Sequence, residues 1–190
     1  MDTPGERLPR KLGVMINDIS SEAPTHLLAV RAKSATRVYV FPVHAIILAI
    51  HCARLPAFPP SSSRTPAEAG SKITLPITKL FIPNPETFSI LLHYLYTKHE
   101  DRLFSALLPI PLEDGKSIDE LSRTYSSTFT VQALLSHANR VRGLWNNVVA
   151  LGIFDERLSV ALERTWDVLS KALAVSTGAS WETVSTVPQL

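Results

Sequence analysis

Residues 27–55 read LLAVRAKSATRVYVFPVHAIILAIHCARL, and this stretch decides which fold to expect. Two runs rich in aliphatic and aromatic residues, 27–32 and 36–41, predict a hairpin or two neighbouring strands. Pro42 is expected to stop the ladder, because proline has no backbone N–H to donate. The run 43–55 is apolar around almost its whole circumference, which is typical of a helix buried in the centre of a domain.

The next part of the chain predicts a loop, a strand and a helix, in that order. Residues 56–71 are rich in proline and serine and predict a loop. Residues 72–82 are strand-like, with an interruption at Pro76, and Asn84-Pro85-Glu86 has the composition of a helix start. The helix that follows has an amphipathic stripe made of Phe88, Leu91, Leu92, Leu95 and Tyr96.

The rest of the chain predicts helices in series. A short helix is expected over 100–108, and Ser117 with Glu120 forms a capping box. A long apolar stripe over 131–149 is closed by Gly152, and Asp155 caps a last helix that ends before Gly178. Strands followed by helices favour an α+β fold over a doubly wound sheet.

The predicted organisation is one domain with two tails. Residues 1–24 are expected to be a flexible N-terminal tail, with a short strand or helix over 12–16. The core covers 25–110 and includes the loop at 56–71. A helical region of the same domain follows over 111–176, and 177–190 is a second tail.

Composition excludes several classes of protein. Of 190 residues, 45% are apolar, so a sizeable core can form. The net charge of +2 argues against nucleic-acid binding by charge alone. Cys52, the one cysteine, allows no disulfide within the chain. With no signal peptide at the start and only a short apolar run at 45–50, we expect an intracellular protein, nuclear or cytoplasmic, without a membrane partner.

No residue pattern for catalysis, cofactor or metal binding stands out. His44 and His51 are seven positions apart, about two helical turns, which is too far for one zinc ion. His93 and His99 are six apart and fall on different faces of a continuous helix. There is no nucleophile elbow and no glycine-rich phosphate loop. We therefore expect a protein that is not an enzyme and needs no cofactor.

The distribution of charge gives the candidate binding residues. No Asp or Glu occurs from Ala23 through Ala67, while basic residues recur there. A basic surface attracts acidic partners, and Thr65 before Pro66 is a candidate for phosphorylation. A solvated strand face is the plainer interpretation of the same pattern. The candidate partner contacts are Arg31, Lys33, Arg37, Arg64 and Thr65.

Two segments resemble BTB/POZ domains. One is the strand-to-helix passage FPVH at 41–44 with IILAIHCARLPAF after it, and the other is TLPITKLFIPNPETFSILLHYLYT at 74–97. The resemblance covers about 27–108 and implies a small β-sheet packed by helices, with additional C-terminal helices. Homodimerising BTB domains keep a basic residue just after the histidine and an acid near the first strand. Here Ala45 follows His44 and the acid is missing, which disfavours the homodimer.

The chain also resembles the fungal clampless-protein family, in RVYVFPVHAIILAIHCARLPAFPP at 37–60 and in its tryptophan-containing C-terminal helices. The resemblance extends over about 23–176. It implies a regulator of sexual development that acts in clamp-cell and dikaryon formation, downstream of mating-type homeodomain factors. The predicted function is a non-enzymatic protein–protein interaction module, with transcription regulators as candidate partners. The alternatives are a BTB-type adaptor of a ubiquitin-ligase complex and a direct DNA-binding regulator.

Overall fold

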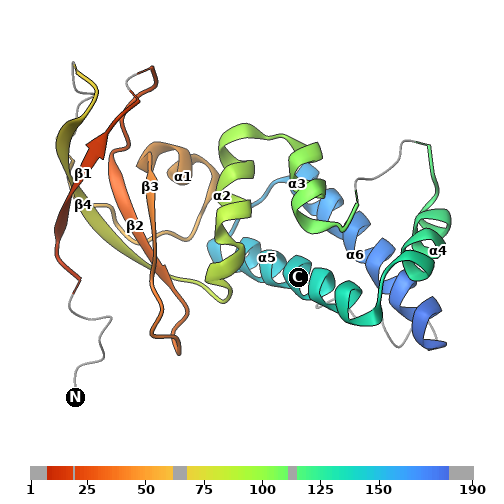
Figure 1. The fold of residues 1–190 in the computed structure, drawn as a ribbon. Helices are drawn as coiled ribbons and strands as arrows, with labels where there is room; N and C mark the ends of the chain where they lie inside the picture. The colour runs from red at the N-terminus through yellow and green to blue at the C-terminus, as the bar shows by residue number, and fades with distance from the viewer. Residues whose placement is uncertain (1–7, 19, 62–67, 111–114, 180–190) are drawn as a thin grey trace. The chain divides into compact units, whose positions relative to one another are not determined.

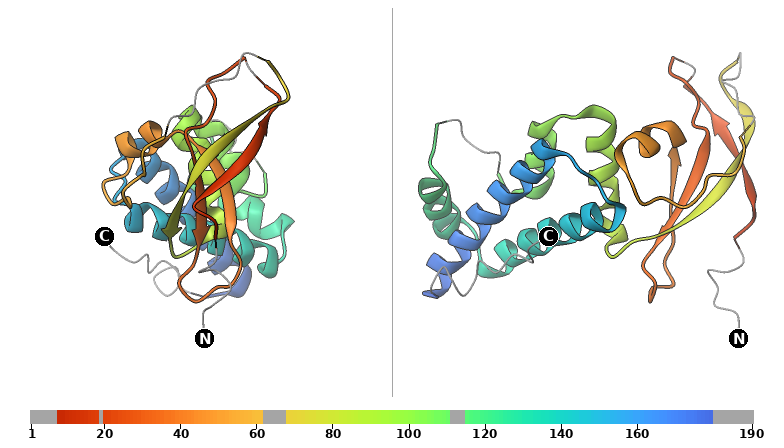
Figure 2. Two further views of the ribbon diagram at one scale, coloured as in Figure 1. Left: turned by 90° about the vertical axis from the view of Figure 1, so that its left-hand side faces the viewer. Right: turned by 180° about the vertical axis from the view of Figure 1, so that it is seen from behind.

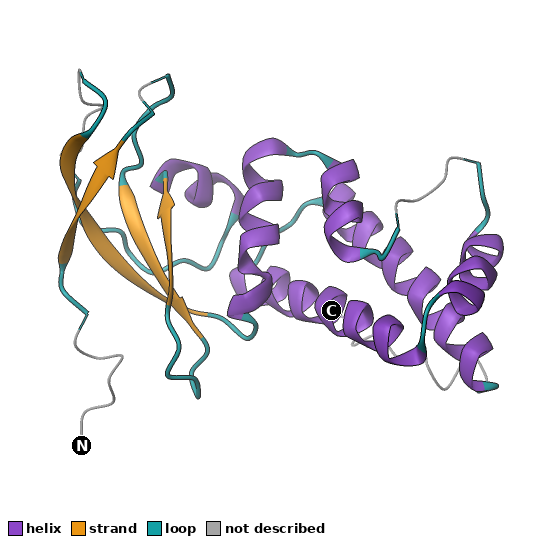
Figure 3. Cartoon of the chain, in the orientation of Figure 1, coloured by secondary structure: helices purple, strands orange, loops and turns teal. Residues whose placement is uncertain are grey.

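A computed structural model describes residues 8–18, 20–61, 68–110 and 115–179 (Figure 1). Its contacts form two compact units. Unit 1 comprises Met1–Pro85 with Ala150–Ile153, and unit 2 comprises Glu86–Val149 with Phe154–Leu190. Strands occur in unit 1 and most of the helices in unit 2 (Figure 3). The α+β class predicted from the sequence is confirmed.

Unit 1 is built on a curled sheet with strand order β1-β4-β2-β3 among the described residues (Figure 2). β2 and β3 form the predicted antiparallel hairpin. β4 runs parallel to β2 and antiparallel to β1. Of the two structures expected for residues 12–16, a strand or a helix, the chain therefore forms the strand. The bounds are β1 Lys11–Ile16, β2 His26–Arg31, β3 Tyr39–Val43 and β4 Ser71–Phe81.

Both predicted proline interruptions of the sheet are wrong. Pro42 lies inside β3, opposite Leu27, and β3 tolerates it because this strand is at the edge of the sheet. Pro76 lies inside β4, opposite Lys11. β1 pairs with β4 as far as Pro76, and β2 pairs with it only from Ile77. Pro76 lies where the pairing with β1 ends and before the pairing with β2 begins. Its missing N–H therefore removes no hydrogen bond to β2.

The prediction that the apolar helix after β3 is buried at the centre is also wrong. α1 spans Ala45–His51, and Leu48 is its buried residue. Ile46 and Ile50 are 64% and 67% exposed, respectively. A helix that is apolar all round can bury only the side that meets the rest of the fold, and a seven-residue helix offers one such side.

A buried histidine ties the chain after α1 to the sheet. His26 is 4% exposed and its ring lies edge-on to Phe58, with centroids 5.0 Å apart. Its Nε2 lies 2.8 Å from the carbonyl of Pro59, which can only accept, so this nitrogen donates. Nδ1 lies 2.9 Å from the Thr25 hydroxyl. The beginning of the predicted loop is thus fixed to β2.

Unit 2 is helical, and its helices begin and end close to the predicted positions. α5 and α6 run in opposite directions and α4 packs on α6 (Figures 1 and 2). A short 3₁₀ turn, Pro85–Thr87, precedes the first helix of this unit. The helices are α2 Phe88–Thr97, α3 Glu100–Leu107, α4 Ile118–Thr128, α5 Val131–Leu151 and α6 Glu156–Thr177.

Three predicted helix signals of unit 2 are confirmed. Ser117 and Glu120 form a complete capping box at the start of α4. The Asp155 side chain accepts from the Leu158 N–H at the start of α6. Gly178 ends α6 in the left-handed conformation, with φ of 67°.

The predicted stripe of α2 is right at its centre and wrong at one end. Phe88, Leu91 and Leu95 are buried, whereas Tyr96 is 40% exposed. Tyr94, outside the predicted stripe, is 1% exposed. Its ring can be buried because its hydroxyl donates to Asp155 over 3.3 Å, a distant partner that an apolar stripe does not reveal.

The short segment Ala150–Ile153 belongs to unit 1 and is bonded to the chain that follows α1. Ala53 donates its N–H to the carbonyl of Gly152, and Arg54 donates to that of Leu151, over 3.1 and 2.9 Å. The predicted domain boundaries at 24, 110 and 176 stay predictions. The contact units divide the chain at Pro85 and again around 150–153.

Candidate partner-binding surface

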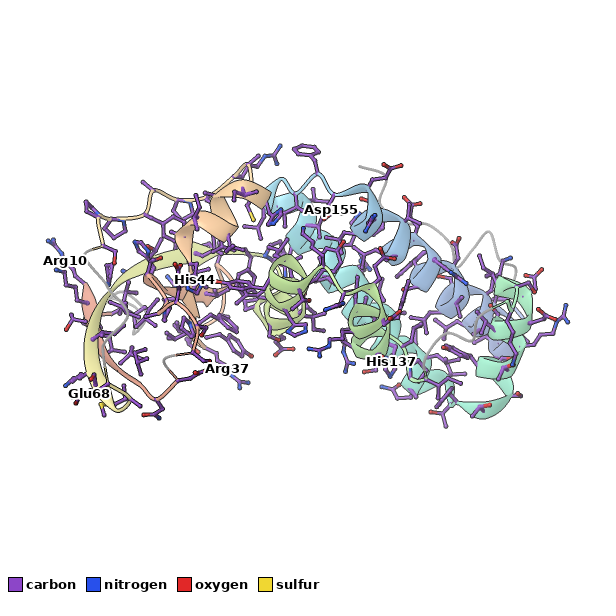
Figure 4. All side chains as sticks on the ribbon, turned by 90° about the horizontal axis from the view of Figure 1, so that it is seen from above. Arg10, Arg37, His44, Glu68, His137 and Asp155 are labelled. Carbon is purple, nitrogen blue, oxygen red and sulfur yellow. The ribbon has the colours of Figure 1, made fainter. Side chains whose placement is uncertain are left out.

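The three described candidate residues all lie at one end of the β2–β3 hairpin. Arg31 is the last residue of β2, and Lys33 lies in the exposed turn that follows. Arg37 precedes β3 and is exposed (Figure 4). Arg64 and Thr65 lie outside the described residues.

Both arginines are held by aromatic rings. The guanidinium of Arg31 lies 4.8 Å from the centre of the Phe81 ring, and that of Arg37 lies 4.7 Å from the centre of the Tyr39 ring. Arg31 also donates to the carbonyl of Ala35 over 3.4 Å. A guanidinium stacked on a ring keeps its in-plane N–H donors at the edge, where they can bind a carboxylate in bidentate fashion.

The strand register shows that the two arginines do not share a face. Tyr39 is opposite Val30, whereas Phe81 is opposite Arg31, the next residue of β2. Neighbouring residues of a strand point to opposite faces of the sheet. The structure therefore brings Arg31, Lys33 and Arg37 to one end of the hairpin but not onto one surface.

The face of the sheet that carries Arg31 contains residues that the sequence did not single out. Val40 and Lys79 lie opposite Ala29 on its two sides, and Phe81 lies opposite Arg31. Val40 and Phe81 are 46% and 44% exposed, and Lys79 is also exposed. We call Arg31, Val40, Lys79 and Phe81 the basic face.

In residues 77–81, side chains at every second position point to the same side of the strand, and this alternation was the signal in the sequence for Lys79 and Phe81. It places both on one side of β4, but it does not reveal that β4 pairs with β2. That pairing joins positions about fifty residues apart. The sequence therefore shows the alternation and not the surface.

The electrostatics of this surface follow from an uneven distribution of charge along the sequence. Residues 23–85 contain seven Lys or Arg and a single acid, Glu68. None of the four strands carries Asp or Glu. Residues 86–190 contain twelve acids against nine Lys or Arg, so the net charge of +2 hides a basic strand region.

His44, at the turn from β3 into α1, serves the fold. Its Nε2 lies 3.1 Å from the carbonyl of Glu22. The next residue, Ala45, donates its N–H to the Thr25 hydroxyl over 3.0 Å. These contacts fasten the start of α1 to the chain just before β2.

Candidates for covalent or metal chemistry are not brought together in the described part of the chain. Cys52 is 6% exposed, and a buried thiol in apolar surroundings is a poor nucleophile. Over the same described ranges, no three His, Cys, Asp or Glu side chains form a group that could hold a metal ion. No helix in those ranges has the length and apolar character needed to cross a membrane.

Comparison with known protein families finds a matching family model for each half of the chain. Residues 1–83 match the family model described as Clampless protein 1 N-terminal domain, and residues 101–189 match the one described as Clampless protein 1 C-terminal domain. The chain belongs to the clampless protein family. The N-terminal match contains the whole sheet, and the C-terminal match begins inside α3. No curated protein and no solved structure matches the chain.

Proposed function

We propose that this chain is a non-enzymatic protein-interaction module that acts in fungal sexual development, in the formation of clamp cells and the dikaryon. Membership of the clampless family supports a role in fungal development. The proposed mechanism is binding of an acidic, partly apolar segment of a partner protein to the basic face.

The observation that carries this proposal is the combination of charge and exposed apolar area on the basic face. Val40 and Phe81 are large apolar side chains left open to solvent beside Arg31 and Lys79. Interfaces commonly have an apolar centre with a polar rim, and complementary charge gives them specificity.

The order of elements supports a BTB-like core as part of the proposal. Phe41-Pro42-Val43-His44 does run from a strand into a helix, and β4 leads into α2 through Pro85–Thr87. These are the passages on which the resemblance to BTB/POZ domains rests. Dimeric BTB domains keep a basic residue where this chain has Ala45. The replacement favours a partner other than a second copy of the chain.

Genetic complementation with a surface variant tests the function. The variant combines Arg31→Gln, Lys79→Gln and Phe81→Ser, all on the basic face, and its control combines Arg123→Gln, Arg142→Gln and Arg164→Gln, three exposed arginines of unit 2. In a fungal strain that lacks this protein and forms no clamp cells, we expect the control to restore clamp cells and the surface variant to fail. Equal rescue by both variants, at equal protein level, would contradict the proposal.

A direct DNA-binding regulator is the second candidate, because basic, acid-free strands attract phosphates as well as carboxylates. Binding of the purified chain to a 20-base-pair duplex and to a glutamate-rich 20-residue peptide separates the two. The interaction module should bind the peptide, and the surface variant should lose it. Duplex binding tighter than peptide binding, falling steeply with salt, would favour the DNA-binding alternative.

A further inference from the structure

Unit 2 contains a pocket whose polar lining is basic or neutral. It lies between α2 and α3 and has a volume of about 240 Å³. Ser89 and His93 line it from α2, Arg102 lines it from α3, and His99 lines it from the connection between the two helices. Glu100 and Asp101, in the first turn of α3, are not among its lining residues.

The contact between Arg102 and His93 determines which nitrogen of His93 carries its proton. Nη1 of Arg102 lies 3.4 Å from Nε2 of His93. A guanidinium keeps its protons and cannot accept, so His93 accepts at Nε2 and carries its proton on Nδ1. Within the described residues, Arg102 has no carboxylate partner. Its positive charge is therefore left for a ligand.

The number of donors indicates the chemistry of that ligand. Arg102 offers several N–H groups, each imidazole offers one, and Ser89 offers a hydroxyl. A carboxylate has two oxygens to satisfy, whereas a phosphate monoester has three terminal oxygens and a charge between −1.5 and −2 near pH 7. Charge-assisted hydrogen bonds of this kind are about twice as strong as neutral ones.

The size and the apolar side of the pocket indicate what carries the phosphate. Pockets for free small molecules usually have at least about 300 Å³, and this one is smaller. Leu103 and Ala106 provide an apolar wall beside the donors. One short side chain, with its methylene against that wall, fits this combination better than a nucleotide does.

We propose that the α2–α3 pocket binds the phosphate of a phosphorylated serine or threonine side chain of a partner protein, with Arg102, His93 and His99 as its donors. The site lies in unit 2 and shares no residue with the basic face of unit 1. Its failure would therefore leave the proposed function standing, and the reverse is also true.

Nuclear magnetic resonance on the full chain tests the site. The probes are capped phosphoserine (N-acetyl-O-phosphoserine amide), inorganic phosphate and capped glutamate, and the readout is the imidazole resonances of His93 and His99. We expect capped phosphoserine to shift both imidazoles in a saturable way and to bind more tightly than the other two probes. Absence of a saturable shift, or binding by capped glutamate that is equally tight, would overturn the proposal.

Two variants and a control locate the binding. Arg102→Gln should weaken phosphoserine binding by about tenfold or more, the usual effect of losing a hydrogen bond to a charged group. His99→Asn should weaken it by a smaller factor, and both residues are exposed, so the fold should survive. Arg164→Gln, on an exposed position of α6, should bind as tightly as the natural chain. Equal weakening by Arg102→Gln and Arg164→Gln would place the phosphate elsewhere. Inorganic phosphate binding as tightly as phosphoserine would overturn the choice of a side chain.

Discussion

At the scale of single residues, Asp155 joins three parts of unit 2. Its carboxylate caps α6 by accepting from the Leu158 N–H over 3.1 Å. It also accepts from Lys98 over 2.9 Å and from the Tyr94 hydroxyl over 3.3 Å. Burial alone would raise the pKa of Asp155, but the bonds from Lys98 and Leu158 outweigh it and hold that pKa below its usual value. Burial, followed by the charge of Asp155, raises the pKa of Tyr94, so its hydroxyl stays a donor.

Asp155→Asn should lower the free energy of unfolding by about 1–2 kcal/mol at pH 7, through loss of the charged bond to Lys98, whereas the asparagine oxygen can still accept from the Leu158 N–H and cap α6. Because the folded pKa is lowered, the carboxylate stabilises the fold fully above its unfolded pKa of about 3.9, and this contribution disappears as the pH falls through the lower folded value. Urea unfolding of both proteins from pH 7 to pH 3 measures this. The difference between them should shrink below about pH 4.

Asp119→Asn is the matched control for this experiment. Asp119 also accepts from a lysine, Lys171, over 2.7 Å, but its side chain is 62% exposed. Water screens such a pair, so the variant should unfold like the natural chain at pH 7. A loss for Asp155→Asn that is the same at pH 3 and pH 7 would contradict the role given to its charge.

Gly152 is the second residue with a specific requirement. It has φ of 63°, and an added Cβ would lie 3.3 Å from Cβ of Ala53 and 3.2 Å from the Arg54 side chain. Gly152→Ala should therefore lower the free energy of unfolding by about 1–2 kcal/mol, the usual cost of the left-handed conformation for a residue with a side chain. Gly178→Ala, where φ is 67° but no atom lies within 4 Å of the added Cβ, is the comparison that isolates the close approach. The Gly152 variant should lose more than the Gly178 variant in thermal unfolding, and the reverse order would contradict this.

At the scale of elements, β4 and α1 show what periodicity leaves open. The buried side of β4 switches at Leu75 and Pro76, which are both buried, because β1 pairs with the first half of the strand and β2 with the second. α1 is apolar on all sides but buries one. In both elements, the neighbours in space determine which side chains are covered.

Thr78 in β4 has a buried hydroxyl without a hydrogen-bond partner in the described structure, and the residue is 5% exposed. Replacing it by valine of the same shape removes the cost of desolvating that hydroxyl. Thr78→Val should raise the free energy of unfolding by about 1 kcal/mol. Thr74→Val, at an exposed position of the same strand, should change it by less than about half of that. Denaturant unfolding of the two variants measures this, and a destabilised Thr78→Val would show that the hydroxyl has a role in the fold.

Because α1 buries only one side, substitutions on its buried and exposed sides should change the free energy of unfolding by different amounts. Leu48→Ala should cost about 2–4 kcal/mol, because Leu48 is 1% exposed. Ile46→Ser, at a position 64% exposed, should stay within about 0.5 kcal/mol of the natural chain. Thermal unfolding of both variants measures the difference. Equal, large losses would mean that α1 is buried on all sides, as its composition predicted.

At the scale of the whole molecule, charge separates the two parts of the sequence. The strand region is basic and the helical region carries an excess of acids, so a near-neutral total says little about either surface. The proposed acidic partner segment would be attracted to the strand region, and the proposed α2–α3 phosphate site is a locally basic exception within the helical region.

Light scattering on the purified chain tests the proposed absence of a BTB-type homodimer. We expect a mass near 20.9 kDa, because the charged pair that such dimers keep is missing where Ala45 follows His44. A mass of twice this value at micromolar concentration would contradict the argument from Ala45. The protein would then resemble the regulators that form BTB-type homodimers.

Local signals predicted much of this fold. The capping box of Ser117 and the caps at Asp155 and Gly178 depend on atoms a few residues apart, so the sequence contains all of their partners. The hairpin of β2 and β3 and the starts of the long helices are local in the same sense. The basic residues Arg31, Lys33 and Arg37 could be singled out because an acid-free stretch is visible without a structure.

The sequence by itself determined the α+β class, the caps of α4 and α6 and a basic strand region, since these follow from propensity, capping and composition. Only the tertiary structure decided that β4 pairs with β2, that Phe81 supports Arg31 and that Ile46 lies in solvent. It also brought Arg102 against His93 across the turn between two helices. Each of these depends on which distant segments meet, and burial and pairing are properties of two surfaces together, which a pattern in one segment does not specify.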